Sequence, residues 1–145
     1  MDSPKLYDVQ LTYRIYGTAI DIVRDRIGFR TLKTKGKEIL LNGKAVFLRG
    51  VCLHEKIEEH GKAVTKEKIH RAFLLDREMN YNSLSLAHYP HTEWVSRLAD
   101  KEGFLLWEEI PVYWWIDFVN HNTLENAKNQ LTELITRAYN MVCRE

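Results

Sequence analysis

From Ala45 onward, the sequence alternates segments of strand character with segments of helix character. Residues 82–87 and 104–110 are rich in apolar residues and predict strands, and three further segments carry apolar residues at three- and four-residue spacing, which predicts helices. Each predicted helix follows a threonine that can cap its first turn: Thr65, Thr92 and Thr123. The order strand, helix, strand, helix, strand, helix predicts an α/β fold with a parallel sheet.

The number of strand and helix units limits the architecture. A closed (β/α)8 barrel needs eight units and about 250 residues, whereas this chain has 145 residues and about three units. The tail Met141–Glu145 also breaks the apolar pattern that a fourth strand would show, which favours an early end of the coding sequence. We therefore expect an open part of a barrel rather than a closed one.

The first third of the chain predicts antiparallel strands instead of strand and helix units. Residues 6–16 alternate apolar and polar side chains, and the extended pattern continues to about residue 33. The charged segment Lys33–Lys37 is interpreted as a connector. Residues 38–49 then form two apolar runs around Asn42-Gly43, a pair that is typical of tight hairpin turns.

Charge and composition exclude several classes of partner. The 21 Lys and Arg residues are balanced by 20 Asp and Glu residues, so the chain lacks the basic surface that nucleic acids select. Its longest apolar stretches fall far short of the roughly 20 residues that span a bilayer. The amino terminus shows no leader pattern, and Cys52 and Cys143 are too few for a disulfide framework, so neither feature indicates a compartment.

Candidate functional residues gather where the predicted parallel strands end. In parallel α/β domains, ligands bind at the carboxyl ends of the strands, where the loops converge. Three segments lie there: Gly50–Glu55, Ala87–His91 and Trp107–Pro111. They supply imidazoles, carboxylates and aromatic rings, a mixture that sugar sites use because hydroxyls need polar partners and pyranose rings stack on aromatic faces.

The histidine spacing does not favour a metal site. Zinc proteases place two histidines four residues apart on one helix, whereas His54 and His60 are six apart, and Pro90 breaks any helix between His88 and His91. We favour functional roles for His54 and His88. The remaining histidines are interpreted as solvated loop residues or hydrogen-bonding residues at strand ends: His60, His70, His91 and His121.

The carboxylates do not form an obvious catalytic pair. Glu108 and Glu109 are consecutive, so a strand would point them to opposite faces and they could not flank one glycosidic bond. Arg49 is placed as a possible partner of Glu109. A loop carries three further acids that are interpreted as solvated: Glu55, Glu58 and Glu59. The aromatic cluster Tyr113–Trp115 is interpreted as packed loop core in preference to a sugar-stacking platform.

An ordered set of motifs then points to one family. The set comprises Gly28-Phe29-Arg30, Leu41-Asn42-Gly43-Lys44, Leu48-Arg49-Gly50-Val51, His54-Glu55, His88-Tyr89-Pro90 and Glu108-Glu109-Ile110-Pro111. In order and spacing, the chain resembles glycoside hydrolase family 2, the β-galactosidase and β-glucuronidase group, from about Leu6 to Tyr139. By this resemblance, residues 1–35 are the last strands of an immunoglobulin-like β-sandwich, and residues 36–145 open a (β/α)8 TIM barrel.

The resemblance also implies roles for three residues. His54 and His88 match substrate-contacting histidines of the family, and Glu109 matches an acid at the end of the third barrel strand. In some members this acid helps to bind Mg²⁺, but a second ligand is a histidine where this chain has Pro111, so no metal or other cofactor is expected. Two positions depart from the family pattern, because Ser85 replaces an arginine and Cys52 replaces an asparagine.

The reaction that the resemblance implies is retaining hydrolysis of a β-linked sugar by two glutamates. In the family these glutamates follow later strands, so this chain is expected to hold no catalytic residue, to be inactive alone and to contribute to a pocket for a β-galactoside-like carbohydrate. The alternative is a non-catalytic carbohydrate-binding or assembly module that completes a barrel with another chain. Open strand edges predict self-association.

Overall fold

The computed structural model describes residues 4–58 and 61–141. The predictions for Glu59, His60, Cys143 and the tail after Met141 lie outside these described residues. The strands are β1 (Leu6–Ile15), β2 (Thr18–Gly28), β3 (Leu32–Lys35), β4 (Glu38–Leu41), β5 (Lys44–Val46), β6 (Gly50–Leu53), β7 (Ser83–Leu86) and β8 (Leu105–Glu108). The helices are α1 (Lys66–Glu78), α2 (Glu93–Glu102) and α3 (His121–Met141).

Three sheets follow one another along the chain. Strands β1 and β2 form a long antiparallel hairpin, and β3, β4 and β5 form a second antiparallel sheet. Strands β6, β7 and β8 form a parallel sheet in sequence order, with Val51 opposite Leu84 and Leu84 opposite Leu106. The predicted alternation of parallel strands and helices is therefore confirmed for the described part of the chain.

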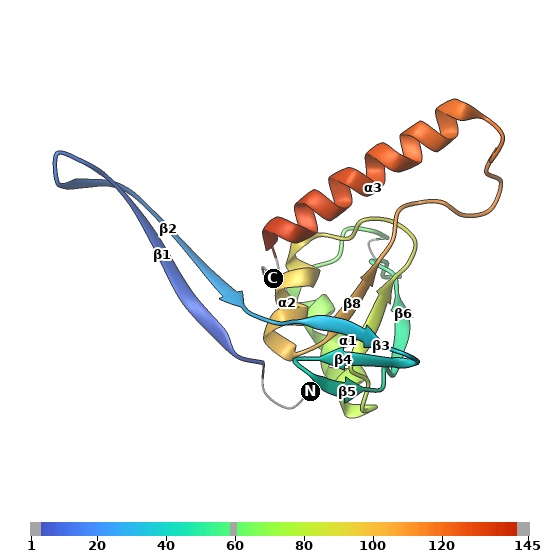
Figure 1. The fold of residues 1–145 in the computed structure, drawn as a ribbon, viewed down its shortest axis with the longest axis horizontal. Helices are drawn as coiled ribbons and strands as arrows, with labels where there is room; N and C mark the ends of the chain where they lie inside the picture. The colour runs from blue at the N-terminus through green and yellow to red at the C-terminus, as the bar shows by residue number, and fades with distance from the viewer. Residues whose placement is uncertain (1–3, 59–60, 142–145) are drawn as a thin grey trace.

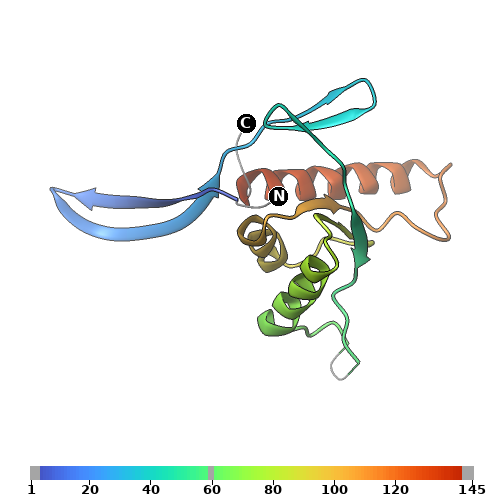
Figure 2. The same cartoon turned by 90° about the horizontal axis from the view of Figure 1, so that it is seen from below.

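The helices cover one face of the parallel sheet. Along β7, Leu84 and Leu86 are buried, whereas Ser83 and Ser85 point to the other face, as the two-residue period of a strand requires. Helix α2 contacts both α1 and α3, and Figure 2 shows it beside the sheet. The core between sheet and helices consists of Ile69, Phe73, Leu84, Leu86, Val95, Leu98, Ala99 and Phe104.

Helix boundaries follow the capping residues closely. The Thr65 hydroxyl accepts a hydrogen bond from the Lys68 N–H, and Gly103 ends α2 with φ of 80°, a conformation that glycine adopts without strain. The predicted start of the third helix was wrong. The Asn120 side chain accepts from the Asn122 N–H, so α3 begins two residues before Thr123.

Two predicted boundaries in the strand region were also wrong. Gly50–Leu53 was placed in a loop but forms β6, because the chain leaves the hairpin after Val46 and pairs again with β7. Lys33–Lys37 was interpreted as a connector, but Lys33–Lys35 belong to β3, which pairs with β4 around a tight turn at Gly36.

Strand β8 is buried on one face only, whereas the apolar run at residues 104–110 predicted a strand buried on both faces. Trp107 lies in register with Ser85 and Cys52 on the face that the helices do not cover, and it is 72% exposed. The apolar stripe of α3 is also partly open, because Leu134 is buried whereas Leu124 and Ile135 are exposed. These apolar groups have no covering layer within the part of the chain that the structure describes.

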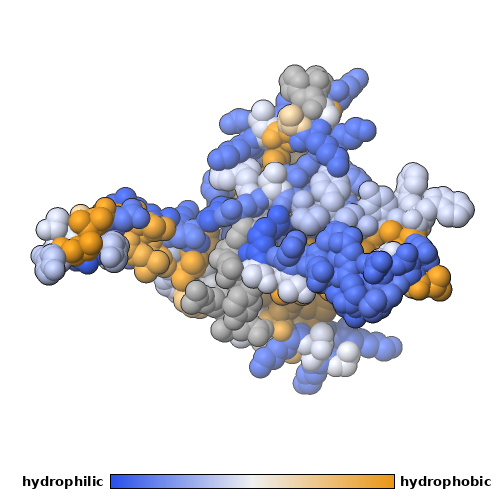
Figure 3. Space-filling view, turned by 90° about the horizontal axis from the view of Figure 1, so that it is seen from above, coloured by the Kyte–Doolittle hydropathy of each residue, from blue (hydrophilic) through white to orange (hydrophobic). Residues whose placement is uncertain are grey.

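The β1–β2 hairpin extends away from the rest of the chain (Figure 1). Its apolar side chains, including Leu11, Ile20 and Val23, are exposed. In Figure 3 this arm shows orange apolar patches among blue polar groups. Near its base, Arg97 of α2 forms an ion pair with Asp25 at 2.5 Å, which also lowers the pKa of Asp25.

Within residues 4–58 and 61–141, no helix combines the length and apolar character needed to cross a bilayer.

The carboxyl of Asp100 on α2 predicts a pH dependence of stability. Burial raises its pKa from 3.8 to about 6, against the attraction of Arg30 and Arg97. Between these two values the folded state binds more protons than the unfolded state, so the free energy of unfolding should fall as pH rises from about 4 to about 6. Asp100→Asn should remove this fall and leave the variant more stable than the unaltered chain at pH 7.

Urea denaturation at pH 4.5 and pH 7 measures the difference. Glu133→Gln, which changes an exposed carboxylate on α3, is the control. If Asp100→Asn and the unaltered chain lose the same stability over this pH range, the assignment to Asp100 is wrong.

Candidate functional site

The carboxyl ends of the parallel strands bring the three predicted site residues together. His54 directly follows β6, His88 follows β7 by two residues, and Glu109 directly follows β8. Because β6, β7 and β8 are parallel neighbours, these ends meet at one edge of the sheet. The site is therefore built by strand register and not by proximity in the sequence.

Glu109 is the polar centre of this group. Its Oε1 accepts a hydrogen bond from the Ser85 hydroxyl at 2.6 Å, and its Oε2 lies 2.7 Å from Nδ1 of His88. The Ser85 hydrogen bond, followed by that of His88, lowers the pKa of the Glu109 carboxyl, so this group is an acceptor at neutral pH. Nδ1 of His88 therefore carries the proton that it donates to the carboxylate.

The two histidines lie against each other and against tyrosines. The His54 and His88 rings meet edge to face with centroids 5.7 Å apart, and the His54 and Tyr89 centroids are 6.3 Å apart. On another side, Tyr113 lies 5.4 Å from the His88 ring. The imidazole of His88 is about half exposed, so polar atoms of the site remain open to a ligand.

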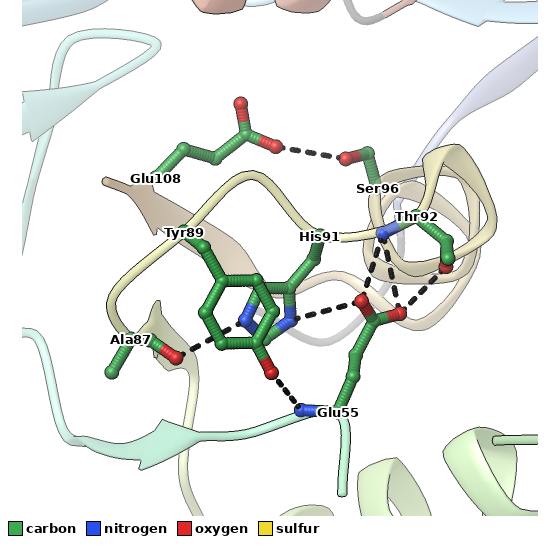
Figure 4. Close-up of polar contacts among 7 residues, drawn as sticks. All are labelled: Glu55, Ala87, Tyr89, His91, Thr92, Ser96 and Glu108. Carbon is green, nitrogen blue, oxygen red and sulfur yellow. Dashed lines mark hydrogen bonds and ion pairs between the residues drawn. The ribbon is translucent and has the colours of Figure 1, made fainter. Parts of the chain in front are cut away.

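Glu55 is not the solvated loop acid that the sequence predicted. It is 8% exposed, and its carboxylate accepts three hydrogen bonds from Thr92: two from the backbone N–H, at 3.1 and 3.2 Å, and one from the hydroxyl, at 2.7 Å (Figure 4). Thr92 precedes the first turn of α2, where free N–H groups and the helix dipole favour an anion. The loop after β6 is thereby tied to the helix that follows β7.

His91 was interpreted as a solvated loop residue or a hydrogen-bonding residue at a strand end, and the structure excludes the first option and shows the second. It is 1% exposed, its ring stacks on Tyr89 with centroids 4.7 Å apart, and its Nε2 lies 3.4 Å from the Ala87 carbonyl oxygen. Burial lowers the pKa of His91, so it is neutral at pH 7 and Nε2 donates to that carbonyl. Nδ1 lies 3.9 Å from a carboxylate oxygen of Glu55.

The sequence held one unused clue to this buried cluster. Thr92 was predicted as a helix cap, and an amino-terminal helix turn needs an acceptor for its free N–H groups. The Thr92 side chain makes no capping bond of its own. An acid at the end of the neighbouring strand, Glu55, supplies the acceptor instead, but recognising this requires knowing that the two loops are adjacent.

Glu108 and Glu109 point in different directions, as predicted. Glu108 accepts from the Ser96 hydroxyl of α2 at 3.0 Å, whereas Glu109 contacts Ser85 and His88. The predicted pairing of Arg49 with Glu109 was wrong. Arg49 lies just before β6, at the opposite end of the sheet, and its Nε donates to the Asn80 carbonyl at 3.2 Å.

The aromatic loop after β8 is exposed, not packed. Trp114 and Trp115 are 87% and 100% exposed, so the interpretation as packed loop core was wrong. Tyr113 contacts both Trp114 and His88 through its ring, which places the start of this loop next to the site.

The residues around Glu109 do not fit a magnesium site. Mg²⁺ needs near-octahedral oxygen ligands at about 2.0–2.1 Å, but both Glu109 oxygens are already engaged by Ser85 and His88. Pro111 has no ligating side chain. Among the described residues, no three His, Cys, Asp or Glu side chains are grouped so that they could hold a metal ion.

Comparison with known proteins assigns the chain to a family. Residues 32–144 match the model of the glycosyl hydrolases family 2, TIM barrel domain. A putative β-glucuronidase of Formosa agariphila is 36% identical over 96% of this chain, and a β-glucuronidase of Bacteroides fragilis is 37% identical over 96%. A β-galactosidase of Actinobacillus pleuropneumoniae is 32% identical over 77%.

Solved structures show the same likeness. A crystal structure of Parabacteroides merdae β-glucuronidase superposes with a TM-score of 0.84, at 30% identity over 97% of this chain and 18% of that protein. A family 2 β-galacturonidase from Eisenbergiella tayi, bound to galacturonate, also gives 0.84, at 31% identity over 99% of this chain and 27% of that protein.

The chain spans 17%, 21% and 10% of the lengths of the three curated relatives. The matched segment includes β3 and every element after it, and hence the strand ends that carry His54, His88 and Glu109. The chain therefore belongs to glycoside hydrolase family 2, and its parallel strands and helices are part of that family's TIM barrel domain.

Proposed function

We propose that this chain supplies one wall of the sugar pocket of a retaining β-glycoside hydrolase. The observation that carries the proposal is the convergence of His54, His88 and Glu109 at the carboxyl ends of three neighbouring parallel strands. In TIM barrel enzymes this end of the strands holds the active site. Family membership makes a glycoside the class of substrate to test first.

Each of the three residues has a role that follows from its contacts. Glu109 holds Nδ1 of His88, so Nε2 of the same ring is left to bond a sugar hydroxyl. His54 lies beside it and presents a second imidazole. Ser85 fixes the other oxygen of Glu109, in the position where the family usually has an arginine.

The chemical step requires carboxylates from outside these 145 residues. Retaining hydrolysis uses one acid to protonate the leaving oxygen and a second carboxylate, about 5–5.5 Å away, to form a glycosyl-enzyme intermediate. Glu108 and Glu109 point apart, and the sequence contains no Asn-Glu pair of the kind that carries the family's acid/base. The proposed role of this chain is thus binding and orientation of the sugar.

The proposed ligand is a β-linked hexose or hexuronic acid. A β-galactoside-like sugar follows from the motifs, and relatives named as β-galactosidases and β-glucuronidases support both options.

We also propose that residues 1–35 correspond to the end of an immunoglobulin-like domain and residues 36–145 to the opening of the barrel. The projecting β1–β2 hairpin supports this division, whereas the pairing of β3 with β4 crosses the proposed boundary.

A second candidate function is assembly without catalysis. Strands β6 and β8 each pair with one neighbour, β7, among the described strands, and Trp107 is exposed beside them. Open edges and apolar faces of this kind bind other chains. Under this alternative the chain docks onto a polypeptide that completes the barrel.

The isolated chain should not hydrolyse β-glycosides. General acid/base help is worth about 10²–10⁴ in rate, and the covalent step would be lost with it. Release of nitrophenol from nitrophenyl β-galactoside and β-glucuronide should equal that of a His54→Ala, His88→Ala double variant. Turnover above this control would contradict the assigned role.

The two histidines should matter once the barrel is complete. In a fusion of this chain with the downstream part of the Bacteroides fragilis relative, His54→Ala or His88→Ala should lower kcat/KM by about 10²–10³, the loss typical of a polar contact in the transition state. His70→Ala is the control, because His70 lies on α1 and faces Glu102. Equal effects at all three positions would show that the site is misassigned. If the fusion is inactive with Ser85, the test is run in a Ser85→Arg background, which restores the residue usual in the family.

The isolated chain should also self-associate through its uncovered sheet face. Sedimentation equilibrium should give an average mass that rises with concentration, and Trp107→Lys should reduce this rise because it places a charge on the apolar face. Leu74→Lys, at an exposed position on α1, is the matched control. A strict monomer with a sharp cooperative melt would argue against open barrel edges.

A further inference from the structure

The loops that carry His54 and His88 are connected through the first turn of α2. Glu55 follows His54 in the sequence, and Thr92 lies four residues after His88. The three hydrogen bonds from Thr92 to the Glu55 carboxylate therefore join the segment after β6 to the segment after β7 (Figure 4). Charged hydrogen bonds of this kind are stronger than neutral ones and are costly to break when buried.

A second contact connects the same two loops closer to the histidines. The Glu55 N–H donates to the Tyr89 hydroxyl at 3.0 Å, and Tyr89 follows His88 directly. The Tyr89 ring stacks on buried His91, whose Nε2 donates to the carbonyl of Ala87, the residue before His88. The backbone on both sides of His88 is thus held by groups that also contact Glu55.

The third strand end is attached to the same helix. Ser96, one turn along α2, donates to Glu108, the residue before Glu109. The start of α2 therefore contacts Glu55, which follows His54, and Glu108, which precedes Glu109, and the chain runs into this helix directly from the segment that carries His88. None of the atoms in these contacts belongs to His54, His88 or Glu109 themselves.

We propose that Glu55 is a positioning residue: its carboxylate accepts hydrogen bonds from Thr92 at the start of α2 and thereby sets the distance and angle between the His54 and His88 rings, while its backbone N–H and the Tyr89 hydroxyl hold the same two loops together. One consequence of this proposal, that the two imidazoles bind the same sugar, rests on the proposed function. The connection between the rings and Glu55 stands on the contacts above, so it can be tested without a substrate.

The test follows the two histidine rings in the 145-residue chain by aromatic ¹H–¹³C NMR, with assignments from His54→Ala and His88→Ala. Glu55→Ala should shift the ring signals of both histidines, weaken the nuclear Overhauser effect between them and speed exchange of the Thr92 N–H by at least about tenfold. The ring signals of Phe73 and Phe104, which pack in the core 5.2 Å apart, should stay in place. General loss of structure would move those core signals as well.

A milder pair of variants covers the case in which Glu55→Ala fails to fold. Thr92→Val deletes the 2.7 Å hydroxyl contact and should shift the same histidine signals in the same direction, whereas Thr92→Ser retains the hydroxyl and should restore them. Glu93→Ala is the matched control, because this exposed acid at the start of α2 pairs with Arg97 and does not contact the loops.

The outcomes separate this proposal from the proposed function. Histidine signals that are unchanged in Thr92→Val, or that move only together with the core signals, overturn the positioning role, as do random-coil signals for His54 and His88 in the unaltered chain. The proposed function is tested separately in the fusion described above, where the barrel is complete. If His54→Ala and His88→Ala leave kcat/KM of the fusion unchanged while the Glu55 and Thr92 variants shift the histidine signals, the positioning role is supported and the proposed function fails.

Discussion

The amino-terminal turn of α2 is the constraint on which the site depends. A helix leaves its first N–H groups without partners inside the helix, so these groups need acceptors from elsewhere. Here the acceptor is the carboxylate of Glu55, from the loop after a different strand. A local requirement of backbone chemistry is thus met by a contact between segments 37 residues apart, and this contact fixes the loops that carry the imidazoles.

The carboxylates at the strand ends divide between structure and site. Glu55 and Glu108 face α2 and bond Thr92 and Ser96, while Glu109 faces the uncovered side and bonds Ser85 and His88. The two-residue period of β8 produces this division, because consecutive side chains leave a strand on opposite faces. Glu108 therefore stabilises the packing of β8 on α2, whereas Glu109 holds the His88 ring in the site.

The uncovered face of the β6–β8 sheet agrees with the match of this chain to one part of longer relatives. Leu84 and Leu86 pack into a core with the helices, but Cys52, Ser85 and Trp107 form a row with no layer over it among the described residues. In a barrel this row would face the interior, where side chains from the other strands fill the space. The likeness to β-glucuronidase structures at TM-scores of 0.84 over nearly the whole chain, but 18–27% of those proteins, agrees with this geometry.

The sequence by itself determined the order of parallel strands and helices, the caps at Thr65 and Gly103, the hairpin at Asn42-Gly43 and the family, because these depend on local backbone preferences and ordered motifs. It also placed His54, His88 and Glu109 at strand ends. It did not reveal that Glu55 and His91 are buried, that Trp107 and Trp115 are exposed, or that Arg49 lies at the far end of the sheet. The tertiary structure decided those features, because burial and the choice of hydrogen-bond partner depend on which distant segments become neighbours. The spacing of residues along the chain does not show which distant segments these are.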